Sequence, residues 1–457
     1  MALSWRAVVL AALGLVPVAI WPVPGTVLLW AVVVVVVCLV DAALAVSPRQ
    51  VTLQRTVPTS VRLGTPTTSR LVLTNAARRR LRALVRDAWP PSLATEHDDD
   101  GGLRPHTDAA EPARTARHRV DLPGGESVRL STPLLPTRRG DRAAGPVTIR
   151  TLGPLRVAGR QASIAVGGRI RVLPEFASRR HLPSRLARLR EMDGRASVQV
   201  RGEGTEFDSL REYVVGDDVR SIDWRATARG GDVVVRTWRP ERDRRVVVVL
   251  DTGRTSAARI GTSSQGSVNN GGTRLEASVE AALLLTALAD RAGDRVQVLA
   301  YDRTLRARVA GASGPRLLPA LADALSAVEP VLLETDWTGL VGQVRARVSQ
   351  RALVVLLTSL DPAVVETGLL PVVDQLAAQH QVVVAAVTDA EVARLRSGRA
   401  DVEEVYDAAA AVRGDLERSA VAAVLRQHGA EVLEALPDDL APRLADTYLA
   451  LKAAGRL

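Results

Sequence analysis

The carboxyl-terminal half of the chain alternates between short apolar runs and longer helical segments, and this pattern constrains the fold most. Val- and Leu-rich runs lie at residues 244–251, 294–302, 352–361, 381–389 and 430–436. Helical periodicity lies at residues 275–290, 316–328, 339–350, 366–379 and 416–428, and again from 437. Continuous apolar strands between helices are typical of a parallel sheet covered on both faces. We therefore expect a Rossmann-like α/β domain with a mainly parallel sheet over residues 244–457.

The amino-terminal end carries apolar runs at residues 7–20 and 26–46, joined by a neutral, proline-containing turn. The second run is long enough to cross a bilayer, which takes about 20 residues. Arg6 precedes the first run and Arg49 follows the second, and positive residues favour the cytoplasmic side. We expect a transmembrane helical hairpin over residues 1–47, placed in the plasma membrane with both ends and the soluble domains cytoplasmic. A cleaved signal peptide followed by one transmembrane helix is the alternative, although no small-x-small site precedes the turn.

Asp41 is the one charged residue in the second apolar run. A charged side chain inside a bilayer is unfavourable unless it has a partner. Because Asp41 lies near the end of the run, we expect it at the membrane interface. A functional carboxylate within the membrane is the alternative interpretation.

Residues 48–173 have a different pattern. Short runs of alternating polar and apolar residues are bounded by Pro, Gly, Asn and Thr. This pattern predicts an antiparallel β-sandwich domain. A spacer is the simplest role for such a domain, and a partner-binding role stays open.

Composition bounds the classes of ligand and partner. The chain has 457 residues, enough for two or three domains, and a formal charge of +10. A basic chain can bind nucleic acid or an anionic membrane surface. No nucleic-acid motif with clustered Lys, Arg and aromatic residues is present, so we expect the lipid bilayer and not nucleic acid as a partner. The single cysteine excludes an intramolecular disulfide, and the histidines lack the paired spacing of a zinc site.

Residues 174–243 combine a basic connecting helix with a dense set of opposite charges. Arginine pairs with carboxylates in a bidentate geometry, so this density predicts an ordered polar network. Asp217, Asp218 and Asp223 lie among arginines, and we expect lowered pKa values that suit structure better than proton transfer.

The stretch over residues 202–229, GEGTEFDSLREYVVGDDVRSIDWRATAR, resembles the signature of the DUF58 family of bacterial proteins. The family pattern is roughly G-x-G-x-E-F, R-E-Y, G-D-D, R-x-I-D-W and A-R. The matching residues are Gly202, Gly204, Glu206, Phe207, Arg211, Glu212, Tyr213, Gly216, Asp217, Asp218, Arg220, Ile222, Asp223, Trp224, Ala228 and Arg229. The stretch is interpreted as a structural clasp against the first strand of the sheet, with a docking surface for another protein as the alternative.

The resemblance implies a von Willebrand factor A-like domain and a functional association with MoxR-type AAA+ ATPases. It covers the chain from the apolar runs to the similar ending at residues 435–457. In open α/β sheets, ligands bind at the carboxyl ends of the strands. Three predicted strands carry a carboxylate there, namely Asp251, Asp302 and Asp361.

By the same resemblance, a von Willebrand A domain binds a divalent cation through D-x-S-x-S after its first strand. Here Asp251 is kept and Thr255 replaces a serine. Gly253 has no side chain to act as a ligand, and Arg254 places a positive charge nearby. The motif is therefore a degenerate site for Mg²⁺ or another divalent cation, which would need about six oxygen ligands.

The other two loops of this site would come from Thr335 and from residues 358–361. Ser359 stands where the family has an aspartate, and Asp361 follows two residues later. The alternative is a metal-free hydrogen-bonded scaffold formed by Asp251 and Thr335. No cofactor is otherwise indicated.

The sequence contains no P-loop, no G-x-S-x-G and no Cys–His pair, so we expect no enzyme activity. The expected function is a membrane-anchored cytoplasmic interaction module. Its partner would be a MoxR-type AAA+ ATPase in protein maturation, assembly or stress response. A metal-dependent hydrolase and an extracytoplasmic adhesion module are the alternatives.

Overall fold

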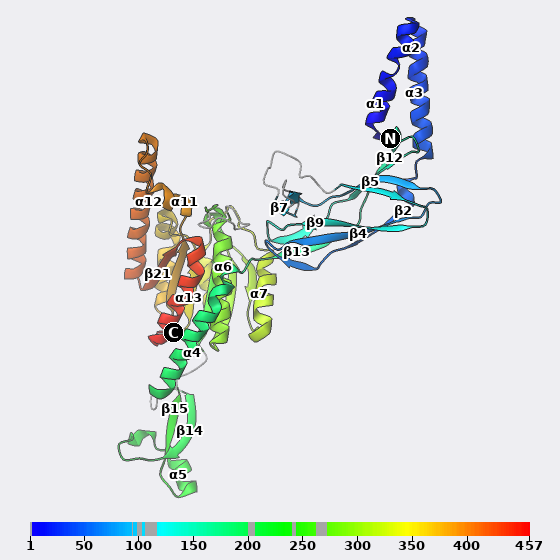
Figure 1. Ribbon diagram of the computed structural model, residues 1–457. Helices are drawn as coiled ribbons and strands as arrows, with labels where there is room; N and C mark the ends of the chain where they lie inside the picture. Colours follow the sequence, from blue (N-terminus) through cyan, green and yellow to red (C-terminus); the bar gives the residue numbers. More distant parts are fainter. Residues whose placement is uncertain are drawn as a thin grey trace. The chain divides into compact units, whose positions relative to one another are not determined.

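The computed structural model describes residues 2–93, 95–97, 103–105, 117–199, 206–239, 244–261 and 272–457. The chain divides into two compact units, Met1–Leu173 and Pro174–Leu457. The first holds apolar helices and β-sheets, and the second holds a large mixed sheet with helices (Figure 1). The protein is therefore multidomain.

Unit 1 begins with three apolar helices, α1 (Trp5–Ala12), α2 (Leu15–Ile20) and α3 (Pro24–Leu44). The segment Pro24–Gln50 contains an 18-residue window with a mean hydropathy of 2.9 and, by length and composition, could cross a membrane. The Trp30 indole Nε1 donates to the Leu10 carbonyl oxygen at 3.2 Å and so ties α3 to α1, which lies alongside it (Figure 1). Most apolar side chains of α3 are exposed.

The β-rich part of unit 1 contains two antiparallel sheets that share a hydrophobic core. Leu71 and Leu73 of one sheet and Val85 and Ile149 of the other are all 0% exposed. The first sheet has the order β1 (Ala2–Leu3), β12 (Ala158–Ile164), β11 (Val147–Leu152), β5 (Leu81–Asp87), β8 (Arg117–Leu122). The second has the order β2 (Val51–Thr56), β4 (Thr67–Asn75), β9 (Ser127–Leu134). A third small sheet has the order β10 (Gly140–Ala143), β13 (Arg169–Leu173), β3 (Ser60–Arg62), and β6 (Thr95–His97) pairs with β7 (Leu103–Pro105).

A buried ion pair lies inside this β-rich part. The Arg55 guanidinium contacts the Asp87 carboxylate at 2.5 Å, and both side chains are 0% exposed. Ser69 and the Trp89 indole also donate to Asp87, at 3.0 and 3.1 Å. Asp87 is therefore saturated with donors, which is the condition under which a buried charge is tolerated.

Asp41 joins α3 to the sheet of unit 1. It is 0% exposed and accepts hydrogen bonds from the backbone N–H groups of Leu155, Val157 and Ala158 at 2.8, 2.8 and 2.9 Å. Within the same turn, Arg156 has a φ of 58°, a left-handed conformation that is uncommon outside glycine. Asp41 therefore orders the turn that enters β12. Its carboxylate is covered by protein, a structural role that neither sequence interpretation had assigned.

Unit 2 is built on a six-stranded, mainly parallel sheet. The strand order is β18 (Leu305–Val309), β17 (Arg295–Tyr301), β16 (Arg245–Asp251), β19 (Leu353–Leu357), β20 (Gln381–Val387), β21 (Ala430–Ala435). All neighbouring pairs are parallel except β17 and β18. The parallel part agrees with the expected mainly parallel sheet, whereas the antiparallel edge strand β18 was not predicted.

Helices cover both faces of this sheet, because the strands carry Val and Leu on both sides. One face packs against α4 (Leu182–Gln199), α6 (Arg274–Arg291), α7 (Leu317–Ser326) and α13 (Pro437–Ala453). The other packs against α8 (Trp337–Arg345), α10 (Leu370–Ala377) and α12 (Val402–Gln427). Helix α12 begins fourteen residues before the predicted start at 416.

Short elements complete the connections of unit 2. They are the 3-10 turns η3 (Ala177–His181), η5 (Arg254–Ala257) and η6 (Gly314–Arg316), the helices α9 (Pro362–Val364) and α11 (Ala390–Leu395), and the π-helical turn η7 (Val365–Leu369). The turn η3 is held against α6, because the Ser178 backbone N–H donates to the Glu280 carboxylate at 2.5 Å.

Glu280→Gln is expected to stabilise the protein at alkaline pH. Burial raises the pKa of Glu280 above the ordinary value of 4.5, outweighing the opposing hydrogen bond from the Ser178 backbone N–H. A carboxyl pKa that is raised in the folded state stabilises the protein below pH 4.5. That contribution is lost as the pH rises through the pKa of Glu280 in the folded state. Glutamine keeps an acceptor for Ser178 without the charge. Thermal unfolding should give the variant a higher Tm than the native protein at about pH 8. The difference between the two Tm values should shrink as the pH is lowered toward 4.5.

The exposed residue Glu403 on α12 provides the matched control. Glu403→Gln removes the same charge from the first turn of α12 without relieving burial, so its Tm should lie at or slightly below that of the native protein and never above it. A Glu280→Gln protein with a lower Tm at every pH would show that the carboxylate is needed for the η3–α6 contact.

Candidate functional site

Asp251 lies at the carboxyl end of β16 and is the centre of a hydrogen-bond cluster. Its Oδ1 accepts from the Thr335 hydroxyl at 2.5 Å and from the Gly253 N–H at 2.8 Å. Its Oδ2 accepts from the hydroxyls of Thr358 and Thr255 at 2.7 and 3.3 Å. Asp251 is 3% exposed, so both oxygens are satisfied by protein donors away from water. The cluster joins the ends of β16 and β19 on either side of the point where the strand order reverses.

A second carboxylate, Asp302, lies at the end of the neighbouring strand β17. It is 0% exposed and accepts from the Thr252 hydroxyl at 2.9 Å and from Arg306 Nε at 2.5 Å. Burial acts to raise the pKa of Asp302, but the bonds from Arg306, Thr252 and the backbone outweigh it, and the pKa lies below its ordinary value. Asp302 therefore holds the loops as an anion and has no proton to transfer near neutral pH.

The donor set around Asp251 does not fit a divalent cation. Both carboxylate oxygens are already engaged, and a Cβ at Gly253 would lie 2.2 Å from the Thr335 hydroxyl, so a ligand side chain has no room there. Arg254 adds a guanidinium that pairs with Glu334 at 2.7 Å. Among the described residues, no group of three or more His, Cys, Asp or Glu side chains could hold a metal ion. The hydrogen-bonded scaffold accounts for this arrangement better than an octahedral Mg²⁺ site.

The structure brings Asp251, Thr255 and Thr335 together but leaves Asp361 outside their hydrogen-bond cluster. Asp361 is the N-cap of α9 and accepts from the Ala363 N–H at 3.2 Å. It also lines a pocket of about 230 Å³ at the carboxyl ends of β19 and β20. The predicted set of metal-site residues is therefore divided between a saturated cluster and an open pocket.

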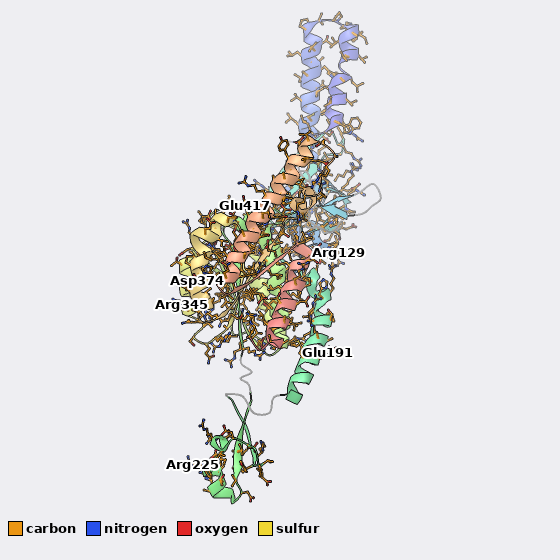
Figure 2. The ribbon with its side chains drawn as sticks, turned by 90° about the vertical axis from the view of Figure 1, so that its left-hand side faces the viewer. Arg129, Glu191, Arg225, Arg345, Asp374 and Glu417 are labelled. Carbon is orange, nitrogen blue, oxygen red and sulfur yellow. The ribbon has the colours of Figure 1, made fainter. Side chains whose placement is uncertain are left out.

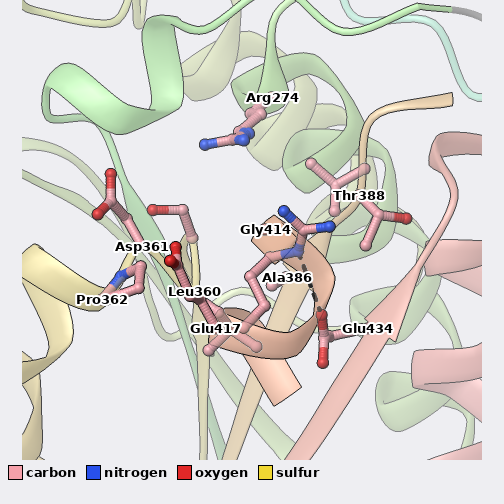
Figure 3. A pocket seen from close by; sticks show the side chains of 12 residues that line it. Arg274, Leu360, Asp361, Pro362, Ala386, Thr388, Gly414, Glu417 and Glu434 are labelled. Carbon is pink, nitrogen blue, oxygen red and sulfur yellow. Dashed lines mark ion pairs between the residues drawn. The ribbon is translucent and has the colours of Figure 1, made fainter. Parts of the chain in front are cut away.

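Two residues of this pocket were not singled out as site residues from sequence. Arg274, the first residue of α6, extends its guanidinium over the pocket (Figure 3). Its Nε is buried and lacks a hydrogen-bond partner among the described residues. Ser359 is only 5% exposed, and its hydroxyl is also buried without a hydrogen-bond partner among the described residues. The only sequence signal was the serine at a position where the family has aspartate.

The family signature folds as a small module over residues 206–239, here called the signature module. Strand β14 (Glu206–Glu212) pairs with β15 (Val234–Arg239), and α5 (Trp224–Gly230) and the 3-10 turn η4 (Val219–Ser221) lie between them. Glu206, Phe207, Arg211 and Glu212 are on β14, whereas Trp224, Ala228 and Arg229 are on α5. Tyr213, Gly216, Asp217, Asp218, Arg220, Ile222 and Asp223 form the connection, and Gly202 and Gly204 lie outside the described residues.

Ion pairs fix the connection in the signature module. Arg211 donates two hydrogen bonds to Asp217, at 2.6 and 2.7 Å, and Arg236 donates to Asp223 at 2.8 Å. Asp223 also caps α5, and Asp218 caps η4. The partner guanidinium is the largest influence lowering the pKa of each carboxyl, Arg211 for Asp217 and Arg236 for Asp223. The predicted polar network and the predicted pKa direction of these two carboxyls are confirmed.

Apolar side chains of the signature module remain exposed. Val215 is 94% exposed, Trp224 65%, Val214 61% and Val219 59%. Arg225, beside Trp224 on α5, is exposed as well (Figure 2). Because ion pairs and caps fix the connection, these side chains are left available for contact with another molecule.

Comparison with known proteins gives one family and several distant structural likenesses. No curated protein matches the chain. It is similar to the ASH / PapD-like domain of human CEP192, at 17% identity and TM-score 0.17, over 28% of this chain and 92% of that one. It is also similar to the CARDB domain of the PF1109 protein from Pyrococcus furiosus, at 15% identity and TM-score 0.16, over 25% and 93%. A type III cohesin module from Ruminococcus flavefaciens is 14% identical with TM-score 0.18, over 28% and 89%. A family model described as "Protein of unknown function DUF58" matches residues 209–428, and this match supports membership of the DUF58 family.

Proposed function

We propose that this protein is a membrane-anchored interaction module that serves as an adaptor for a MoxR-type AAA+ ATPase. The observation that carries the proposal is the exposed apolar surface of the signature module, formed by Val214, Val215, Val219 and Trp224. Tryptophan is enriched among the residues that dominate the binding energy of protein interfaces. A partner that covers this surface would bury Trp224 against a rigid, ion-paired frame.

Membrane anchoring is supported by α3 and by the shorter helices before it. The exposed apolar surface of α3 matches the lipid interior, and α1 with α2 would complete a transmembrane hairpin. The connecting turn is uncharged and arginines flank the apolar runs, which favours cytoplasmic soluble units. A reporter fused after Leu457 checks this orientation. Activity only outside the cytoplasm would support the adhesion-module alternative instead.

The α/β unit supports a von Willebrand A-like arrangement, since its mainly parallel sheet carries helices on both faces. The proposal assigns no catalytic step and no metal to this unit. The saturated state of Asp251 gives no support to a metal-dependent hydrolase.

Trp224→Ala and Val215→Ser are each expected to weaken capture of the ATPase at least about tenfold, the effect of losing roughly 1.4 kcal/mol of binding energy. The tagged full-length chain is isolated from its native membranes, and co-purifying proteins are quantified by mass spectrometry. Both side chains are largely exposed, so the variants should retain the thermal stability of the native protein.

Val402→Ser serves as the matched control, because Val402 is 73% exposed on α12, outside the signature module. If all variants capture the ATPase equally well, the docking surface lies outside the signature module. Recovery of no AAA+ ATPase by the native chain, even after crosslinking, would refute the adaptor proposal.

A further inference from the structure

We propose that the pocket at the ends of β19 and β20 binds one carboxylate group of a partner protein, directly through Arg274 and Ser359. This inference rests on the proposed interaction function and says which chemical group of a partner protein the pocket would bind. It replaces the cation expected from the family resemblance with a guanidinium and a hydroxyl.

The first observation is the pair of unpartnered polar groups. Buried polar atoms are nearly always hydrogen-bonded, and leaving one unpaired costs about 1–3 kcal/mol. Both the Ser359 hydroxyl and Arg274 Nε are in this state within the described part of the chain, and both residues line the pocket. A carboxylate accepts from a guanidinium and a hydroxyl together, so one ligand group would satisfy both.

Charge in the pocket selects a monoanion. Arg418 is paired with Asp415 and approaches Glu434 at 4.0 Å, so it is already neutralised. Glu417, whose carboxylate also lines the pocket, is paired with Arg413 at 3.0 Å. Arg274 is thus the one pocket-lining guanidinium without an ion pair at contact distance among the described residues, although the carboxylates of Asp389 and Asp361 still act on it electrostatically.

The carboxylates that line the pocket disfavour a dianion. Asp361 lines the pocket from the loop after β19, and Glu417 and Glu434 line it from α12 and β21 (Figure 3). Inorganic phosphate would bring close to two negative charges against a single free guanidinium. A carboxylate brings one charge and a planar pair of acceptors, which matches the guanidinium fork.

The position of the pocket agrees with this assignment. In open α/β sheets, ligands bind outside the carboxyl ends of the strands. Ser359 follows β19, and Thr388, which also lines the pocket, follows β20. The pocket is therefore open at the edge of the sheet where such folds receive ligands.

The partner's carboxylate could belong to an acidic side chain or to a chain terminus, and two probes distinguish these sources. N-acetyl-aspartate α-amide carries only a side-chain carboxylate, and N-acetyl-asparagine α-amide is its neutral analogue of nearly the same shape. N-acetyl-alanine carries only a terminal carboxylate, and N-acetyl-alaninamide is its neutral analogue. Titration calorimetry of the purified full-length chain in detergent, at constant ionic strength, measures each affinity.

Arg274→Gln is expected to weaken binding of the carboxylate probes at least about tenfold, because it removes a charge-assisted pair of hydrogen bonds. Ser359→Ala should weaken it several-fold. Arg291→Gln is the matched control, since Arg291 is exposed at the opposite end of the same helix α6. Phenylglyoxal modification of Arg274, followed by peptide mass spectrometry, should slow in the presence of the binding probe and not of its neutral analogue.

Equal affinity of the native chain for a carboxylate probe and its neutral analogue would overturn the inference. So would unchanged binding by Arg274→Gln, or tighter binding of inorganic phosphate than of either carboxylate. None of these outcomes changes the interpretation of the ATPase capture experiment, because that experiment tests binding by the signature module. Conversely, if carboxylates bind through Arg274 but no ATPase is recovered, the inference about the pocket is supported and the adaptor role is refuted.

Discussion

Replacing Asp251 by alanine is expected to destabilise unit 2 by about 3 kcal/mol or more, because hydrogen bonds to a charged group contribute about 1.5–3 kcal/mol each. The substitution leaves the hydroxyls of Thr335, Thr358 and Thr255 and the Gly253 N–H without their acceptor. These groups come from three separate loops, so the loss is not confined to one. Urea unfolding of the purified full-length chain, followed by tryptophan fluorescence, measures the effect as a lower transition midpoint. Trp337 is 6% exposed in the core of unit 2 and reports on that transition.

Asp361→Ala is the control for Asp251→Ala. Asp361 also follows a strand at the carboxyl edge of the sheet, but its side chain accepts a hydrogen bond only as the N-cap of α9. Loss of a cap costs about 1 kcal/mol. Equal destabilisation by the two substitutions would contradict the central role of Asp251. Unchanged stability of Asp251→Ala together with lost metal binding would restore the cation-site interpretation.

The expected cost also determines how docking should be tested. A protein destabilised by several kcal/mol can lose its partners because it unfolds, whatever surface it uses. Asp251→Ala is therefore a poor probe of an interaction site at the strand ends. Arg274→Gln and Trp224→Ala change side chains that no described residue depends on for a hydrogen bond or ion pair, so they separate binding from folding.

The parallel sheet could be predicted from sequence because its strands are nearly pure Val and Leu runs. β16 and β19 are buried on both faces, and an uninterrupted apolar run is the direct signature of that environment. The edge strand β18 was missed because it alternates polar and apolar residues and is half exposed. The start of α12 was missed because most residues of its first half are exposed and only the small Ala408 and Ala411 are buried there, so the core-facing periodicity is weak.

The candidate site was harder to predict, because it depends on which donors meet. Asp251 and Thr335 were singled out at their strand ends, but Thr358 was not, and its bond to Asp251 completes the saturation that disfavours a metal. Arg274 is remote in sequence from Ser359, so no local spacing indicates that they share a pocket. In the signature module, charge density predicted ion pairs, whereas the partners Arg211–Asp217 and Arg236–Asp223 required the fold.

Asp41 is the clearest case of a role that sequence could not assign, and its substitution has the second large expected effect. Asp41→Ala removes the acceptor of three backbone N–H groups, those of Leu155, Val157 and Ala158. Hydrogen bonds to a charged group contribute about 1.5–3 kcal/mol each, and losing three should destabilise this turn by roughly 3 kcal/mol or more. Amide hydrogen exchange of these three residues in the full-length chain should accelerate about 100-fold or more, since each factor of ten corresponds to about 1.4 kcal/mol.

Gly153→Ala tests the same contact from the opposite side. A Cβ at Gly153 would lie 2.2 Å from Asp41 Oδ1, so alanine must push the carboxylate away from the turn. It should therefore accelerate exchange at the same three amides. Leu155→Ala is the matched control, because the Leu155 side chain is 56% exposed and only its backbone N–H binds Asp41. If Asp41 acted instead as a carboxylate within the membrane, Asp41→Ala would leave these amides protected and Gly153→Ala would have no effect on them.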